Sequence, residues 1–216
     1  MPNVIVLVPH PDDEVLGFGG TIQKHVAKGH DVHVMFAEQT HTEERYRIQA
    51  GCALEASADL GFTFSWLNLT ELELLNPTLE VVSKVESCLA EKVPDVLYLP
   101  HPGDTHQYHT AVFNIARAAT RIQGTVPVKQ IYCGEIISST DSCINLLSSK
   151  FNPNYYERLT EKQVELKYKA LSKYYLEVNH YPHPRSRRGV FTTAQKRGME
   201  SGTEYAEAFE CLRFVA

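Results

Sequence analysis

The first half of the chain alternates between short apolar runs and amphipathic segments. Residues 3–8 form a continuous, β-branched apolar run that is typical of a buried strand, and residues 15–28 carry apolar positions at the spacing of a helix face. The same patterns predict further strands at 31–37, 63–67, 94–99 and 128–133, and further helices at 43–60, 77–92 and 108–122. Strands that alternate with helices in this way predict βαβ units and a mainly parallel sheet.

The last third of the chain has a looser pattern. It predicts an ordered loop at 151–160, a polar amphipathic helix at 161–178, a turn-rich basic segment at 180–189 and a helix at 190–200. Neither an internal repeat nor a low-complexity linker interrupts the chain. We therefore expect residues 1–216 to form a single α/β domain.

The composition of the chain argues against several classes of protein. A net charge of −5 argues against a protein that coats nucleic acid or anionic membranes, which needs a basic face. No apolar run reaches 18 residues, so no transmembrane segment is expected, and the apolar N-terminus lacks the basic flank of a signal peptide. The five cysteines are scattered without a CxxC pair, which favours reduced thiols and a cytoplasmic location.

The stretch VPHPDDEVLGFGG (8–20) places three consecutive acids just after the first strand. His10 and Asp13 are three residues apart, and a loop that turns into a helix can direct both side chains to one point. Imidazole and carboxylate are suitable zinc ligands, and a cation would offset the repulsion among the acids. The alternative is structural, because aspartate at a strand–helix junction is a common N-cap. Glu14 is interpreted as a helix-start carboxylate.

A second polar cluster, HPGDTHQYH (101–109), follows the strand predicted at 94–99. In a parallel sheet this loop and the first one lie at the same edge, so a third ligand from here would complete a three-ligand, catalytic type of site. Spacing alone does not separate His101, His106 and His109 as that ligand. The remaining histidines are expected at surface or helix positions: His25, His30, His33, His41, His180 and His183.

The two motifs together resemble the PIG-L/LmbE-like zinc-dependent N-deacetylases. Later stretches are similar to the branch of that family found in sugar and surface-polysaccharide gene sets: GEIISST (134–140), FNPNYY (151–156), KALSKY (169–174), HPRS (183–186) and YAEAFE (205–210). The resemblance spans almost the whole chain and implies a Rossmann-like fold. This agrees with the alternation of strands and helices.

The resemblance also implies residue roles. His10, Asp13 and His109 would bind Zn²⁺, Asp12 would act as general base, and His106 would stabilise the oxyanion. A zinc-bound water would attack the acetamide of an N-acetylated amino-sugar derivative. The implied enzyme is an N-acetylglucosamine-type deacetylase of sugar or glycoconjugate metabolism, and some relatives self-associate, so a homo-oligomer is compatible with it.

One position departs from the family pattern. Relatives often carry an aspartate immediately before the ligand histidine, whereas this chain has Tyr108. The missing carboxylate would hold His106 protonated. Asp104 is a candidate substitute partner for His106, and the Tyr108 hydroxyl is a candidate to orient a ring or contact substrate.

Basic residues are the other candidates for substrate binding. Arg185 in HPRS, together with Arg45 and Arg47 at the start of the helix predicted at 43–60, could bind phosphate or sugar groups. Arg187 and Arg188 add positive charge that would suit a phosphorylated or nucleotide-linked sugar.

Three other interpretations compete with the zinc deacetylase. A nucleotide-binding domain with GFGG as its phosphate loop fits less well, because the run lacks the GxGxxG spacing and follows acids that repel phosphate. A catalytically silent metal-binding relative and a deacylase of a non-sugar amide are the others. The ligand set alone would also accept iron, cobalt or manganese.

Overall fold

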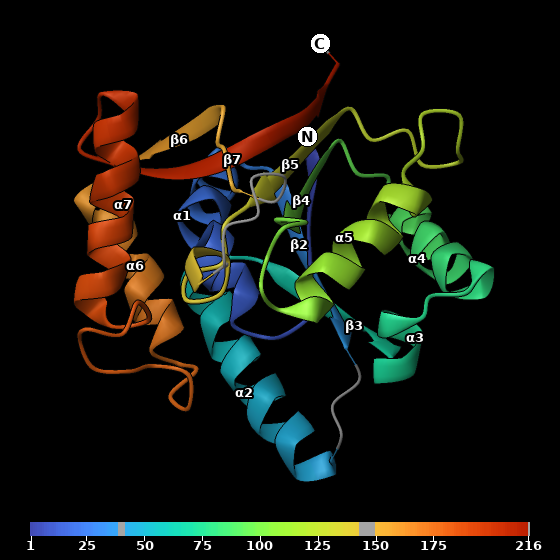
Figure 1. Ribbon diagram of the computed structural model, residues 1–216, viewed down its shortest axis with the longest axis horizontal. Helices are drawn as coiled ribbons and strands as arrows, with labels where there is room; N and C mark the ends of the chain where they lie inside the picture. Colours follow the sequence, from blue (N-terminus) through green and yellow to red (C-terminus); the bar gives the residue numbers. More distant parts are fainter. Residues whose placement is uncertain (39–41, 143–149, 216) are drawn as a thin grey trace.

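The computed structural model describes residues 1–38, 42–142 and 150–215 and contains one seven-stranded sheet (Figure 1). Its strands are β1 (Asn3–Val8), β2 (Asp31–Glu38), β3 (Thr63–Leu69), β4 (Val96–Pro100), β5 (Gln130–Gly134), β6 (Tyr155–Leu159) and β7 (Tyr205–Phe214). The order across the sheet is β3-β2-β1-β4-β5-β7-β6, and pairing is parallel from β3 to β5. The expected Rossmann-like, mainly parallel α/β fold is confirmed.

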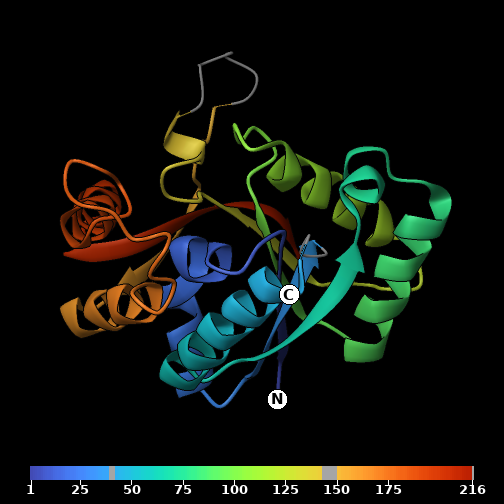
Figure 2. The ribbon, with the colours of Figure 1, turned by 90° about the horizontal axis from the view of Figure 1, so that it is seen from below.

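Helices cover both faces of the sheet. They are α1 (Asp13–Ala27), α2 (Glu43–Leu60), α3 (Glu71–Leu75), α4 (Leu79–Lys92), α5 (Gln107–Ala119), α6 (Glu161–Leu171) and α7 (Arg187–Ser201), with a short 3-10 turn at Thr140–Ser142. Figure 2 shows α3, α4 and α5 together on one side of the sheet and α1, α2 and α6 on the other. No helix among residues 1–38, 42–142 and 150–215 is both long and apolar enough to cross a bilayer.

Strand β1 shows how the sheet builds two cores. Val4 and Val6 pack with buried side chains of α1, α2, α6 and α7, whereas Ile5 and Leu7 pack with those of α3, α4 and α5. Successive strand residues point to opposite faces, so a strand covered on both sides is apolar at every position. This explains the continuous apolar run at 3–8.

The antiparallel edge of the sheet differs from the prediction. The predicted loop at 151–160 contains β6, and β7, which pairs antiparallel with both β5 and β6, was not predicted. Glu207 and Glu210 interrupt the apolar pattern of β7, and Glu207 is only 6% exposed although it is charged. Its carboxylate lies 2.7 Å from Lys167 Nζ and accepts the backbone N–H of Gly20 and Thr21 at 2.9 and 2.7 Å. A buried charge is tolerated when it is paired in this way.

Two smaller predictions also needed correction. The helix predicted at 161–178 ends at Leu171, after which the chain turns. His33 lies on β2 and is buried, with its ring nitrogens 2.8 Å from the hydroxyls of Thr63 and Ser65, so it is neither a surface nor a helix residue. His41 falls outside the described residues.

The glycines of GFGG allow close packing of α1. A Cβ on Gly17 would lie 2.7 Å from Ile136 Cδ1, and one on Gly20 would overlap the side chain of Leu159 on β6. Since the Gly20 N–H is also bonded to a carboxylate, this run packs a helix on the sheet and does not form a phosphate loop.

The strand order determines where a ligand site can form. From β1 the chain proceeds outward through β2 to β3, and it then returns to place β4 on the other side of β1. The loops that follow β1 and β4 therefore diverge from adjacent strands. Parallel α/β sheets bind ligands in the crevice that such a reversal opens at the carboxyl ends of the strands.

Candidate metal centre and catalytic pocket

His10, Asp13 and His109 meet in the crevice between β1 and β4. Each offers one ligand atom, and these atoms all lie within 4.8 Å of one another. The Asp13 carboxylate lies between the two rings, 3.1 Å from His10 Nδ1 and 3.2 Å from His109 Nε2. Asp13 opens α1 and His109 lies in the first turn of α5, whereas His10 lies in the loop between β1 and α1.

The three side chains of this cluster shift one another's pKa values. Burial lowers the pKa of His10, but Asp13 and Glu38 outweigh it and raise that pKa to about 10. Burial likewise opposes ionisation of His109, but Asp13 and Asp104 raise its pKa to about 9. Burial opposes ionisation of Asp13 too, yet the two imidazoles hold its pKa well below the usual range. The acids around the two imidazoles thus favour positive charge at this point of the pocket.

Further carboxylates lie behind the two imidazoles. Asp104 Oδ2 lies 3.1 Å from His109 Nδ1, and Glu38 Oε2 lies 3.1 Å from His10 Nε2. Asp104 also accepts the hydroxyls of Ser139 and Thr140. Glu38 ends β2 at the same sheet edge; sequence reasoning missed it, although its place at a strand end was a usable signal.

We expect Asp104→Asn to weaken metal binding about 10- to 100-fold, because partners that orient a ligand imidazole typically contribute that much. The amide keeps the size of the side chain but removes the charge beside His109 Nδ1. Competition with a chelator of known affinity measures the effect. Asp141→Asn, which removes an exposed neighbouring carboxylate, is the control; equal affinity in both variants would contradict the role given to Asp104.

Asp12 adopts an unusual backbone conformation. Its φ of 119° lies in a region that residues other than glycine rarely occupy. Its N–H donates to Glu14 Oε2 at 2.9 Å, and Glu14 Oε1 accepts the Tyr174 hydroxyl at 2.5 Å. Glu14 is thus more than a helix-start carboxylate, since it holds the strained turn. Burial raises the pKa of Glu14 to about 7.

The side chain of Asp12 is buried beside an arginine. Asp12 Oδ2 accepts one guanidinium N–H of Arg185 at 2.7 Å, and the same nitrogen donates to Glu177 at 2.8 Å. Burial and the neighbouring Asp13 raise the pKa of Asp12 well above its usual value, and Arg185 opposes the shift. Arg185, predicted to bind substrate, lies in the pocket but contacts protein carboxylates there.

These groups line a pocket of about 160 Å³. Its lining residues are His10, Pro11, Asp12, Asp13, Arg45, Gln49, His106, His109, Ser139, Glu177 and Arg185. Gln49 and Glu177 are additions that no sequence motif indicated, and Ser139 lies in the GEIISST stretch without having been named as a candidate. Arg45 belongs to the lining as predicted, whereas Arg47 is exposed and pairs with Glu43 at 3.1 Å on the surface of α2.

The three histidines of HPGDTHQYH have separate positions. His109 belongs to the candidate metal-binding cluster and His106 lines the pocket. His101 is buried elsewhere, 3.4 Å from Glu210 and in edge contact with Phe151. The alternatives that spacing left open are thus distinguished by tertiary structure.

His106 is the N-cap of α5. Its Nδ1 accepts the backbone N–H of Tyr108 at 3.3 Å, so the neutral ring carries its proton on Nε2. Burial lowers its pKa, and His10 and His109 act in the same direction. Asp104 contacts the backbone N–H of His106 at 2.7 Å, but its carboxylate faces the ring of His109. The ring of His106 therefore does not receive the charged partner that Asp104 was expected to supply.

Tyr108 packs beside the pocket without lining it. Its ring lies 5.6 Å from that of His10 and 5.3 Å from that of His106, and the residue is 8% exposed. Burial and a hydrogen bond with Glu71 of α3 raise the pKa of its hydroxyl to about 12. The hydroxyl thus faces α3. Substrate contact by Tyr108 stays a prediction.

Comparison with known proteins places the chain in a family. The model of the PIG-L family, described as GlcNAc-PI de-N-acetylase, matches residues 5–120 and so includes both histidine motifs. A search of curated protein sequences found no match.

Several solved structures share the fold. The conserved protein TT1542 from Thermus thermophilus is 22% identical with a TM-score of 0.80, covering 100% of this chain and 97% of its own. N,N'-diacetylchitobiose deacetylase from Pyrococcus horikoshii is 23% identical with a TM-score of 0.79, and the match covers 97% of this chain and 83% of the deacetylase. GalB, the 4-carboxy-2-hydroxymuconate hydratase from Pseudomonas putida, is 14% identical with a TM-score of 0.76, and the match covers 100% of this chain and 98% of the hydratase. Because the family match covers more than half of the chain and both motifs that build the pocket, the chain belongs to the PIG-L family.

Proposed function

We propose that this chain is a zinc-dependent hydrolase that removes the N-acetyl group from an amino-sugar derivative in sugar or glycoconjugate metabolism. The observation that carries the proposal is the pocket in which the His10–Asp13–His109 cluster adjoins the Asp12 carboxylate and the His106 ring. The family description and the activity named for the chitobiose deacetylase support it. The hydratase has a similar fold but a different activity, so the proposal rests on the residues of the pocket and not on the fold.

The cluster fits zinc by its chemistry. Two imidazoles and one carboxylate form a three-ligand set that leaves a position open for catalysis. Asp104 behind His109 supplies the carboxylate–histidine pair that metal sites commonly use. Bound zinc supplies a Lewis acid that polarises a carbonyl group and lowers the pKa of a water molecule.

Asp12 is the group placed to move protons. Its carboxylate lines the pocket beside the three-residue cluster, and burial raises its pKa above the usual value, which favours uptake of a proton. It would take the proton of the attacking water and deliver it to the leaving amine. Its hydrogen bond from Arg185 and the strained turn held by Glu14 fix the position of its carboxylate.

His106 is the group placed to donate to the carbonyl oxygen as negative charge develops there. Its Nδ1 is occupied by the N–H of Tyr108, which leaves the Nε2–H available to the pocket. A neutral donor can act in this way without the family's aspartate. The enzyme is therefore proposed to be active despite Tyr108, in contrast to a catalytically silent relative.

We expect His106→Ala to lower kcat about 10²-fold, within the range that follows the loss of one oxyanion donor. His106→Gln, which restores an N–H donor, should recover part of the loss. Steady-state kinetics with methyl N-acetylglucosaminide measure both variants, with the exposed His180→Ala as control. Unchanged activity in His106→Ala would remove this residue from the mechanism.

The decisive test of the proposed function is release of acetate and free amine from methyl N-acetylglucosaminide by metal-loaded protein. Activity should disappear with a chelator and return with zinc. A protein that binds one metal yet releases no amine from any N-acetylated sugar would contradict the proposal.

Two further assignments accompany the proposed activity. We place residues 1–216 in one catalytic domain, because strands from both ends of the chain share the sheet. We place the enzyme in the cytoplasm, because Cys52, Cys88, Cys133 and Cys211 are all free, as suits a reducing compartment.

A further inference from the structure

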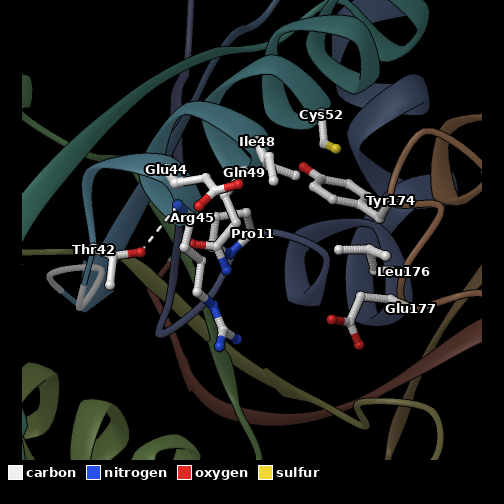
Figure 3. Close-up of a pocket in the computed structure, with 10 residues that line it drawn as sticks. All are labelled: Pro11, Thr42, Glu44, Arg45, Ile48, Gln49, Cys52, Tyr174, Leu176 and Glu177. Atoms are coloured by element: carbon white, nitrogen blue, oxygen red, sulfur yellow. Dashed lines mark hydrogen bonds between the residues drawn. The ribbon is translucent and has the colours of Figure 1, made fainter.

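A second and larger pocket adjoins the catalytic one. It has a volume of about 340 Å³ and lies between α2 and the segment that follows α6 (Figure 3). It shares four lining residues with the catalytic pocket, namely Pro11, Arg45, Gln49 and Glu177. A molecule whose acetamide lies at the metal cluster could therefore extend into this second pocket past the shared residues.

One wall of the pocket is a single face of α2. Arg45, Ile48, Gln49 and Cys52 follow the spacing i, i+3, i+4 and i+7, which brings their side chains to one side of a helix. Figure 3 shows them opposite Tyr174, Leu176 and Glu177.

The polarity of the lining changes with position. Three of the four residues shared with the catalytic pocket are charged or polar, whereas those found only in the second pocket combine Thr42 and Glu44 with four apolar side chains. These apolar side chains are Ile48, Cys52, Tyr174 and Leu176. Tyr174 is 3% exposed, and its hydroxyl is held by a hydrogen bond to Glu14. Leu176 is 68% exposed, although burial of a leucine side chain is favourable.

The charges in the lining do not suit a pyrophosphate. They are Arg45, Glu44 and Glu177, and Glu177 is already paired with Arg185. Arg187 and Arg188, which the sequence suggested for a phosphorylated or nucleotide-linked sugar, lie elsewhere: Arg187 pairs with Glu165 at 2.6 Å and Arg188 stacks over Tyr181. Recognition of a diphosphate normally uses several donors in a basic setting.

We propose that the second pocket is a subsite for an apolar alkyl or aryl substituent carried by the amino sugar. The inference rests on the proposed function for the position of the sugar. Its volume falls within the roughly 300–1,000 Å³ of small-molecule sites. The substrate class is then an N-acetylated amino sugar with a lipid-like or aromatic aglycone, in preference to a free or nucleotide-linked sugar.

The test compares binding of the octyl and methyl β-glycosides of glucosamine by calorimetry with zinc-loaded protein. Neither probe carries an acetamide, so binding is measured without turnover. We expect the octyl glycoside to bind about tenfold tighter or more, because burying even two methylene groups yields that factor. Uridine diphosphate glucosamine, the competing class, should show no such gain over the methyl glycoside.

Two variants locate the effect in the pocket. Cys52→Trp fills it and Ile48→Asn makes its wall polar, so the octyl-to-methyl affinity ratio should fall toward one in both. The matched control is Leu54→Trp, which introduces the same side chain at a 63% exposed position of α2 and should keep the ratio. The affinity for the methyl glycoside serves as an internal check that each variant is folded.

The outcomes separate the subsite from the proposed reaction. Equal binding of octyl and methyl glycosides by the unaltered protein, or tightest binding of the nucleotide sugar, overturns the subsite. An octyl preference that survives both Cys52→Trp and Ile48→Asn also overturns it. Failure to cleave any N-acetylated glycoside, with the octyl preference intact and lost in the variants, rejects the hydrolase and retains the subsite.

Discussion

Asp12→Asn is expected to lower kcat by about 10²–10⁴-fold, the usual contribution of a general acid–base group, without changing the bound metal. The amide has the size of the carboxylate but cannot take up the proton of the attacking water. Asparagine also tolerates positive φ better than most residues, so the turn at φ 119° should persist. The proposed metal ligands His10 and Asp13 on either side are unaltered.

Kinetics with methyl N-acetylglucosaminide and metal analysis of the same samples measure this outcome. Asp31→Asn provides the control, because it removes an exposed carboxylate at the opposite end of the parallel strands. Activity of Asp12→Asn within twofold of the unaltered protein would exclude Asp12 as the base. Loss of metal together with activity would show that the residue supports the cluster and does not move protons.

The strained turn explains why the large effect is expected at this residue. A conformation that costs about 1–3 kcal/mol persists only where surrounding groups impose it. Here Glu14 accepts the Asp12 N–H, Tyr174 donates to Glu14, and Arg185 donates to the Asp12 side chain. Asp13 can then face the metal cluster while Asp12 faces Arg185. Three acids in a row are therefore compatible, because each has a different partner.

The convergence of His10, Asp13 and His109 could be anticipated from sequence because it depends on a general rule. Loops after parallel strands meet at one edge, so two motifs that each follow a strand were expected to converge. The rule does not state which strands are neighbours, and it could not separate His101 from His109. That choice depends on where helix α5 begins and on the pairing of His101 with Glu210 of β7, an element the pattern did not predict.

The partners of Arg185 and Asp104 were beyond prediction for a different reason. Arg185 reaches Asp12 across 173 residues of chain, and its bond depends on how the segment before α7 packs on the sheet. Asp104 is close in sequence to both His106 and His109, yet the turn at the start of α5 directs it to His109. Local spacing gives candidates, and packing selects among them.

His109→Ala is expected to lose the metal, with affinity reduced by more than the 10- to 100-fold expected for its partner Asp104, and activity should fall to background. The side chain is buried between Asp13 and Asp104, and alanine removes the only ligand atom that position 109 supplies. Metal content after dialysis measures the loss, and added imidazole should restore part of it in His109→Gly. His106→Ala provides the diagnostic contrast, since that variant should keep its metal while its kcat falls.

The rings of His106 and His109 stack with centroids 4.9 Å apart, so proximity alone does not assign their roles. If His109→Ala retained one metal per chain and His106→Ala did not, the ligand and donor roles would have to be exchanged.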